Sequence, residues 1–286
     1  MKKHYEVIII GSGIAGMTAA IYLKRGGVSP LIIEESAPGG QLNKVNVIEN
    51  YPGFEKTDGP SLAFNIYNQV RKLDIEYLFD KVTKTDFTNN IKVYTSKLEL
   101  TCDYLIIATG KISKKLFSDD DRYIGSGISY CALCDSHLYK DKDVVVTGNN
   151  DLAFSEAIYL SDIASSVTLI TNNKYNDKRI KIINSSVKEF IGQDALTGVK
   201  LENDDVIKCS AAFIYNGYIT EVNFLNELGI INDSGNIDVD SRMETNVKGI
   251  YAAGDIIKKD VYQINTAVSE GCIAALSAKM DIINEK

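Results

Sequence analysis

Two closely spaced cysteines and the acid that follows them are the residues best suited to chemistry. Cys131 and Cys134 form a C-x-x-C motif, and Asp135 comes next. This spacing places two sulfur atoms at disulfide distance, and such motifs often lower the pKa of one thiol so that a thiolate is available. The segment predicts a dithiol–disulfide redox centre, although a structural disulfide or two free thiols would use the same residues.

The other cysteines indicate no second centre. Cys102, Cys209 and Cys272 lie in apolar or strand-like segments, and we expect them to be buried as small hydrophobic residues. A zinc site would need another pair of ligands, and His4 and His137 are the two histidines of the chain. Five cysteines with one close pair are also unlike the disulfide framework of a secreted protein.

The N-terminal segment has the pattern of a dinucleotide-binding unit. Residues 5–10 form an apolar run that predicts a strand buried on both faces. A glycine-rich turn, a helix over residues 14–25 and a strand over residues 31–33 follow. Glu34 comes 23 residues after Gly11, close to the ~20 residues of the dinucleotide fingerprint.

Each glycine of this turn has a physical task. Gly11 would allow the tight turn, Gly13 would let a pyrophosphate approach the backbone, and Gly16 would let helix and strand pack closely. The helix N-terminus offers N–H groups and a positive dipole end to phosphates, and Glu34 can accept hydrogen bonds from a ribose diol. We therefore expect a bound dinucleotide, the alternative being a glycine-rich turn without a ligand.

The same unit recurs, so the chain predicts two domains. Residues 143–170 repeat the order strand, turn, helix, strand. The strand expected near residue 250 returns to the first domain. We therefore predict a discontinuous domain of residues 1–115 and 245–286 and an inserted domain of residues 116–244. The fold class is α/β, with two Rossmann-like three-layer domains, the second inserted into the first.

Five short motifs resemble a known family. They are Gly39-Gly40-Gln41-Leu42, Glu49-Asn50-Tyr51-Pro52-Gly53, Ala108-Thr109-Gly110, Cys131-Ala132-Leu133-Cys134-Asp135 and Ala252-Ala253-Gly254-Asp255. Their order and spacing, over nearly the whole chain, resemble the low-molecular-weight thioredoxin reductases. The resemblance implies FAD/NAD-linked reductase domains, FAD on the first domain, thioredoxin as the partner and a homodimer.

The resemblance also implies roles for single residues. Cys134 would face the flavin and take its electrons, Cys131 would attack the disulfide of thioredoxin, and Asp135 would be the acid/base of the thiols. The implied FAD-binding residues are Gly11, Ser12, Gly13, Ala15, Gly16, Glu34, Glu35, Gly40, Gln41, Asn50, Val82, Ala108, Thr109, Gly110, Gly254, Asp255, Gln263 and Ile264. Where the family reads Arg-Gln-Ala, this chain has Tyr262-Gln263-Ile264.

The second unit departs from the family where a nicotinamide nucleotide would bind. Asn150 stands at the second glycine position, where a side chain would crowd the pyrophosphate. The family's His-Arg-Arg motif, which grips the 2′-phosphate of NADPH, is replaced by Thr171-Asn172-Asn173, which lacks guanidinium groups. Alternatively, Asn150 adopts a glycine-like conformation, which Asn tolerates better than most residues, and the site binds weakly.

These losses resemble those of the ferredoxin-dependent flavin thioredoxin reductases. We therefore expect reduced ferredoxin as the electron donor and no tightly bound NADPH. Transfer of two electrons from a ferredoxin near ~−400 mV to thioredoxin near ~−270 mV is downhill by about 6 kcal/mol. Two lysine clusters, Lys111/Lys114/Lys115 and Lys258/Lys259, are candidates for docking an acidic ferredoxin.

Two other functions use the same features. One is a reductase driven by NAD(P)H or a deazaflavin, and the other is a redox-sensing FAD-binding protein. The net charge of −7 argues against nucleic acid as a partner. Gly11 interrupts the first apolar run long before it could span a bilayer, and no signal peptide is recognisable, so we expect a cytoplasmic protein without a membrane segment.

Overall fold

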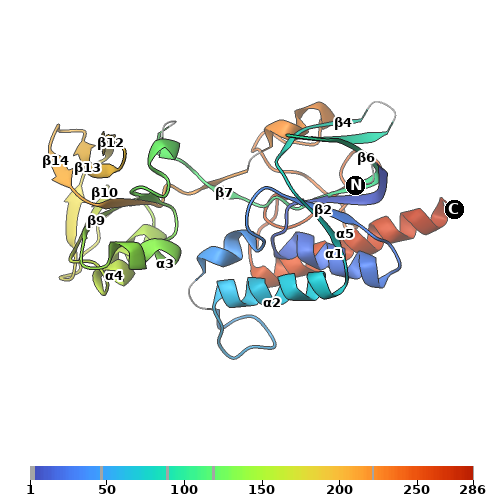
Figure 1. Cartoon of the computed structure of the whole chain (residues 1–286), viewed down its shortest axis with the longest axis horizontal. Coiled ribbons are helices and arrows are strands. Elements are labelled where there is room, and N and C mark those ends of the chain that lie inside the picture. The colour runs from blue at the N-terminus through green and yellow to red at the C-terminus, as the bar shows by residue number, and fades with distance from the viewer. Residues whose placement is uncertain (1–3, 46–47, 88–89, 118–119, 221, 286) are drawn as a thin grey trace. The chain divides into compact units, whose positions relative to one another are not determined.

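The chain folds into two units, whose elements are labelled in Figure 1. The computed structural model describes residues 4–45, 48–87, 90–117, 120–220 and 222–285, without the side chains of residues 121, 133 and 134. Unit 1 comprises Met1–Ile112 and Thr220–Lys286, and unit 2 comprises Ser113–Ile219. The crossings fall in strands β7 (Ile112–Ser113) and β16 (Tyr218–Ile219). Unit 2 is thus inserted into unit 1, and the predicted α/β fold class is confirmed.

Unit 1 is built on a seven-stranded sheet in the order β3-β2-β1-β6-β5-β4, with β17 also paired to β6. The strands are β1 (His4–Ile10), β2 (Leu31–Glu34), β3 (Glu76–Phe79), β4 (Val82–Phe87), β5 (Ile91–Thr95), β6 (Glu99–Ile107) and β17 (Ile250–Ala252). The β1, β2, β3, β6 and β17 strands are parallel, whereas β4 and β5 form an antiparallel edge. A parallel core needs cover on both faces, which explains the uninterrupted apolar run of β1.

Alternate residues of β1 belong to two different cores. Val7 and Ile9 pack with the helices α1 (Ile14–Arg25), α2 (Gly59–Lys72) and α5 (Ile264–Asn284). Ile8 and Ile10 face the other side and pack with the segment around residues 225–257. The sheet therefore lies between a helical layer and a layer of short elements. No helix of the described residues is long and apolar enough to cross a membrane.

Residues 220–244 belong to unit 1, whereas the predicted boundary at 245 assigned them to the inserted domain. The short 3-10 helix η4 (Asn223–Leu228) buries Leu225 and Leu228 in the core of the sheet. Thr85 of β4 also donates a hydrogen bond to the Phe224 carbonyl, at 2.6 Å. The segment contains no long helix or strand, so its sequence carries no periodic pattern that would have placed the boundary.

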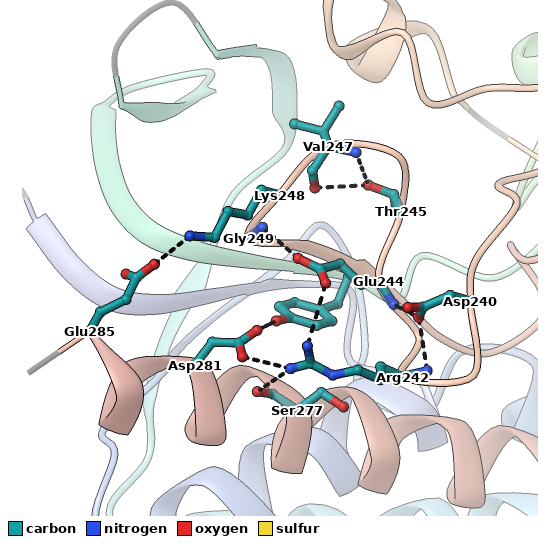
Figure 2. A network of polar contacts seen from close by, with 11 residues as sticks. Asp240, Arg242, Glu244, Thr245, Val247, Lys248, Gly249, Ser277, Asp281 and Glu285 are labelled. Carbon is teal, nitrogen blue, oxygen red and sulfur yellow. Dashed lines mark hydrogen bonds and ion pairs between the residues drawn. The ribbon is translucent and has the colours of Figure 1, made fainter.

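Polar contacts fasten α5 to the loop before β17 (Figure 2). Arg242 Nη2 lies 2.6 Å from Asp281 Oδ1, and the hydroxyl of the fully buried Tyr251 donates to Asp281 Oδ2. Lys248 pairs with Glu285 at 2.8 Å. Burial alone would raise the pKa of Asp281, but the hydrogen bonds from Tyr251 and Arg242 outweigh it and lower this pKa. The network therefore holds α5 beside β17.

Unit 2 has a five-stranded parallel sheet in the order β11-β10-β9-β15-β8. These strands are β8 (Ile128–Ser129), β9 (Asp143–Thr147), β10 (Ser166–Thr171), β11 (Lys181–Asn184) and β15 (Ala211–Ile214). The helices α3 (Ala132–Asp135) and α4 (Asp151–Ser161) contribute to one core. An antiparallel sheet of β12 (Val187–Gly192), β13 (Leu196–Leu201) and β14 (Val206–Lys208) covers the other face.

Candidate functional site

The first glycine turn of unit 1 leaves open space in front of helix α1. Gly11 has φ +98°, and a Cβ there would lie 2.5 Å from the Ala108 carbonyl oxygen. A Cβ at Gly16 would lie 2.0 Å from the Gly11 carbonyl oxygen. Gly13 differs, because a Cβ there would meet nothing within 4 Å. Gly11 and Gly16 thus allow the chain to fold, whereas Gly13 leaves room for another molecule.

The N-terminus of α1 is suited to an anion. Its N-cap Gly13 provides no side-chain hydrogen bond, and no acidic residue lies in the first turn. The first N–H groups of a helix have no partner within the helix, and the helix dipole adds positive potential there. Open space and available N–H groups together fit the pyrophosphate of a dinucleotide.

Other segments predicted to bind FAD meet at this turn. Gly39 donates its N–H to the Ser12 carbonyl at 2.8 Å, and a Cβ at Gly40 would lie 3.4 Å from Gly13. A Cβ at Gly254, next to Asp255, would lie 3.1 Å from Ala15. The structure therefore brings together three motifs that are far apart in the sequence.

Glu34 is held at the end of β2. Its Oε2 accepts the Ser12 N–H at 2.7 Å and the Ser12 hydroxyl at 2.9 Å. Its Oε1 accepts the N–H and the hydroxyl of Ser36 at 2.9 and 3.2 Å. Hydroxyls can rotate, so the carboxylate can exchange these two bonds for ribose hydroxyls. Nearby, Glu35 pairs with Lys81 at 3.2 Å, and Val82 follows at the buried start of β4.

Thr109 contains a buried polar atom without a hydrogen-bond partner among the described residues. It follows Ala108 at the end of β6 and precedes Gly110, which has φ +64°. Its Oγ1 makes no hydrogen bond in this structure. Buried hydroxyls rarely stay unpaired, because desolvation without a partner is unfavourable. A ligand in the cradle would supply the partner, so the residues present fit FAD.

A second group of contacts gathers at the start of α5. Asn50 Nδ2 donates to Gln263 Oε1 at 3.1 Å, and Gln263 also caps α5 immediately before Ile264. Gln41 Nε2 donates to the Lys111 carbonyl at 2.6 Å. The Lys111 ammonium lies 3.7 Å from the centre of the Tyr262 ring. An aromatic ring over a lysine thus stands where the resembled family has an arginine.

Lys259 and Glu270 form a buried ion pair that the sequence did not indicate. Lys259 Nζ lies 2.8 Å from Glu270 Oε2, which also accepts the Gly254 N–H at 2.9 Å. Each of the two side chains is 11% exposed. Burial raises the pKa of Glu270, and Lys259 opposes that rise. Lys259 therefore supports the Gly254 turn and does not belong to an exposed docking cluster with Lys258.

The candidate redox centre lies in unit 2. Cys131 forms a disulfide and is 8% exposed. The side chain of Cys134 lies outside the described part of the chain. Cys102 and Cys209 are free and buried, as predicted, and burial raises the pKa of Cys209 to about 12. Cys272 is only half-buried, on a helix that contributes its smaller residues to the core, so the prediction of burial was wrong there.

Ser129 joins the backbone of Cys131 to the side chain of Asp135. Its hydroxyl donates to Asp135 Oδ2 at 2.7 Å and accepts the Cys131 N–H at 3.0 Å. Ser129 ends β8, is 3% exposed and pairs with Phe213 of β15. The Asp135 N–H donates to the Cys131 carbonyl at 3.2 Å. Neither a motif nor a spacing singled out Ser129, because its partners are set by the chain reversal at Tyr130.

The glycine turn of unit 2 is closed by Asn150. This residue is extended, with φ −151° and ψ 163°, so the alternative of a glycine-like conformation is wrong. Its Oδ1 accepts the Ala153 N–H at 2.9 Å, and its Nδ2 donates to the Tyr215 carbonyl at 2.7 Å. Asp151 places a carboxylate in the first turn of α4. The cap occupies an N–H that a phosphate would use, and the carboxylate repels it.

The end of β10 has neutral polar contacts in place of the acid of unit 1. Asn149 Oδ1 accepts the Thr171 hydroxyl at 3.1 Å and the Asn172 N–H at 2.7 Å. These residues match Ser12 and Glu34 in position, but donor and acceptor are exchanged. Asn173 Nδ2 donates to the Tyr175 hydroxyl at 3.2 Å. None of these side chains supplies a cation for a 2′-phosphate.

Sequence comparison assigns the chain to a family of flavin- and nucleotide-linked oxidoreductases. The family model described as "Pyridine nucleotide-disulphide oxidoreductase" matches residues 5–271, and the chain belongs to this family. It is 36% identical to the thioredoxin reductase of Bacillus subtilis, over 97% of this chain and 95% of that protein. It is 38% identical to the thioredoxin reductase of Ureaplasma parvum, over 97% of each chain.

Solved structures give the same picture. Thioredoxin reductase from Lactococcus lactis superposes with a TM-score of 0.85 and 34% identity, covering 98% of this chain and 99% of that one. A ferredoxin-flavin thioredoxin reductase from Clostridium acetobutylicum has a TM-score of 0.58 and 31% identity, with the same two coverages. The relatives thus include proteins named for different electron donors.

Proposed function

We propose that this chain is a flavin-dependent thioredoxin reductase that works through FAD and the Cys131–Cys134 disulfide. The observation that carries the proposal is the disulfide of Cys131 beside a carboxylate that Ser129 holds in place. The open cradle at Gly13 supports FAD as the cofactor, and the names of the relatives support thioredoxin as the substrate. A homodimer and a cytoplasmic location stay predictions from the sequence.

The residues of unit 1 would bind and orient the cofactor. Bound FAD would supply the electron pair that opens the disulfide. The α1 N-terminus and Gly13 would hold its pyrophosphate, Glu34 would accept its ribose hydroxyls, and Thr109 would donate to it. Lys259 and Glu270 would keep the Gly254 turn in place beneath it. Each assignment follows from an open space or an unused polar group described above.

The residues of unit 2 would manage thiols and protons. When the disulfide opens, each sulfur leaves as a thiolate, and a nearby acid that donates a proton stabilises one of them. Asp135 would be this acid, and it would later take the proton back so that Cys131 can attack the disulfide of thioredoxin. The Ser129 hydroxyl donates to Asp135 and accepts the Cys131 N–H, so it would keep acid and thiol in register.

Reduced ferredoxin is proposed as the donor in place of NADPH. Asn150 caps α4, Asp151 adds a negative charge, and Thr171-Asn172-Asn173 provides no cation. A dinucleotide with three phosphates would therefore meet an occupied N–H and a repulsive carboxylate. The likeness to the ferredoxin-flavin thioredoxin reductase of Clostridium acetobutylicum is consistent with this donor.

The docking site for ferredoxin is narrower than the two lysine clusters of the sequence. Lys259 is buried in an ion pair, and Lys111 lies against Tyr262. Lys258 of unit 1 and Lys114 and Lys115 of unit 2 are exposed. We propose Lys258 as the docking cation of unit 1, because it is exposed and follows the Gly254-Asp255 turn.

The donor can be tested by anaerobic mixing. The yellow holoenzyme is mixed in turn with NADPH, NADH and photoreduced ferredoxin, while flavin absorbance and thioredoxin thiols are followed. We expect fast bleaching and thiol release with ferredoxin alone. Fast bleaching by micromolar NADPH would refute the donor and favour a nucleotide-driven reductase. Bleaching by ferredoxin without thiol release would instead refute the reductase and favour a redox sensor.

A matched variant separates electron entry from thiol chemistry. Cys131→Ser should bleach with ferredoxin as the wild type does but release no thioredoxin thiols, because the attacking sulfur is absent. Cys272→Ser, which changes a half-buried cysteine outside the motif, should leave both signals unchanged. Thiol release by the Cys131→Ser variant would contradict the role proposed for this residue.

A further inference from the structure

A buried tyrosine contacts the backbone beside the redox cysteine. Tyr215 directly follows β15, and its hydroxyl accepts the N–H of Ala132 at 2.9 Å. Ala132 is the first residue of α3 and the neighbour of Cys131. Tyr215 is 8% exposed, and its ring belongs to the same core as Ala132. The contact is therefore shielded from water and tied to a strand of the central sheet.

Glu156 sets the orientation of this hydroxyl. The Tyr215 hydroxyl lies 3.2 Å from Glu156 Oε2 and donates its proton to that oxygen. A tyrosine hydroxyl has one proton, so its lone pairs are left to face the Ala132 N–H. Glu156 lies on α4, so the chain of hydrogen bonds runs from α4 through Tyr215 to the start of α3.

This arrangement opposes the effect that a helix start has on a cysteine. N–H groups at a helix start stabilise a neighbouring thiolate and lower the thiol pKa. Here one of these N–H groups is already bound by an oxygen with a carboxylate behind it. A thiolate at Cys131 would therefore lose a donor and meet added negative potential. Such a thiol would need a base to ionise it, which is the role proposed for Asp135.

We propose that Tyr215 and Glu156 are positioning residues that restrain the start of the C-x-x-C helix and keep reduced Cys131 in its thiol form. The inference deepens the proposed reductase function, on which it rests. It assigns to the protein a thiol that is ionised by Asp135 when the substrate disulfide arrives. Neither residue touches the reacting sulfur in the contacts described.

The titratable surroundings of the pair are few among the described residues. Asp135 on α3 and Tyr139, which follows it, face the Cys131 side, and Tyr218 of β16 faces Glu156. Burial raises the pKa of Glu156, whereas the hydrogen bond from Tyr215 lowers it. Titration of Cys131 therefore has to be followed well above the range of the carboxylates, from about pH 6 to pH 10.

The test measures the ionisation of Cys131 directly. Holoenzyme carrying Cys134→Ser, which leaves Cys131 as one free thiol, is alkylated with iodoacetamide across this pH range, and the Cys131 peptide is quantified by mass spectrometry. The variants Tyr215→Phe and Glu156→Gln are made in the same background. Tyr123→Phe is the matched control, because this buried tyrosine of unit 2 donates to the Gly192 carbonyl.

Tyr215→Phe should make alkylation at pH 7 about two- to ten-fold faster, the range of one hydrogen bond. The cause should be a lower apparent pKa with an unchanged rate at high pH. Glu156→Gln keeps an acceptor for the hydroxyl but removes the charge, so it should shift the pKa in the same direction and by less. Tyr123→Phe should match the parent.

Three results would overturn the proposal. An unchanged pKa in Tyr215→Phe would remove the role of the hydroxyl, and an unchanged or raised pKa in Glu156→Gln would remove that of the carboxylate. A rate that rises equally at every pH would indicate greater exposure of Cys131 and no effect on its ionisation. Alkylation requires neither donor nor thioredoxin, so failure of the reductase function would show only in the anaerobic mixing experiment.

Discussion

Replacing one glycine of the first turn should separate cofactor binding from folding. Gly13 has φ −65° and ψ −179°, a conformation that alanine adopts readily, and its Cβ would meet nothing within 4 Å. Alanine at a helix N-cap is less favourable than glycine by about 0.5–1 kcal/mol. The smaller freedom of the unfolded chain returns about 0.4–1 kcal/mol. Gly13→Ala should therefore leave the stability of the FAD-free protein within ~0.5 kcal/mol of the wild type.

The same methyl group would stand where the pyrophosphate has to approach. Hydrogen bonds to charged groups are worth about 1.5–3 kcal/mol each. Loss of one such bond between the α1 N-terminus and a phosphate would weaken FAD binding about ten- to a hundred-fold. Gly16→Ala is the contrasting variant, because its Cβ would lie 2.0 Å from the Gly11 carbonyl oxygen. Overpacking of this kind destabilises by about 1–3 kcal/mol, or about 2–4 °C for each kcal/mol in a domain of this size.

Both quantities can be measured on protein from which FAD has been removed. Thermal unfolding followed by circular dichroism gives stability, and quenching of flavin fluorescence during titration gives the FAD Kd. We expect Gly13→Ala to unfold as the wild type does and to bind FAD weakly, and Gly16→Ala to unfold early. Wild-type FAD affinity in Gly13→Ala would refute the placement of the pyrophosphate, and early unfolding of that variant would refute the open space.

Three further predictions concern other parts of the molecule. Ser129→Ala removes the hydrogen bond to Asp135, so thioredoxin reduction should fall about ten-fold with a shifted pH–rate profile; an unchanged profile would leave Ser129 without a role in proton transfer. Asp281→Asn breaks the contacts with Arg242 and Tyr251 and should lower the free energy of unfolding in urea by about 1–3 kcal/mol at pH 7. Because the pKa of Asp281 is lowered in the folded protein, this contribution is present above the pKa of the unfolded chain and fades as pH falls through the folded value, so wild type and variant should converge in acid; a constant difference down to the acid range would contradict the pairing. Finally, bleaching by ferredoxin should slow as ionic strength rises, and a salt-independent rate would argue against a docking site built on lysines.

The local patterns of the sequence were sufficient for the fold of unit 1 and for its cradle. The apolar run of β1, the spacing of three glycines and Glu34 describe one continuous stretch of chain, and the helix over residues 14–25 was confirmed. Backbone conformation and steric contact over such short distances depend on neighbouring residues. They are therefore visible in the order of the residues.

The closure of the second turn needed both levels. Asn150 at a glycine position was evident from the sequence, but either a glycine-like or an extended conformation was compatible with it. The contact with the Tyr215 carbonyl, 65 residues away, accompanies the extended form, in which the side chain caps α4. A helix cap that depends on a distant strand cannot be derived from the turn alone.

Tertiary structure alone decided the buried polar pairs. Lys259 with Glu270, Ser129 with Asp135 and Glu156 with Tyr215 are joined by hydrogen bonds between residues that no motif connects. A polar side chain is worth burying only when a partner satisfies it, and the partner is chosen by how strands and helices pack. The sequence by itself determined which cofactor cradle and which cysteines this protein has. The packing of β8, β15 and α4 determined which side chains surround Cys131, because those contacts exist only after the sheet has formed.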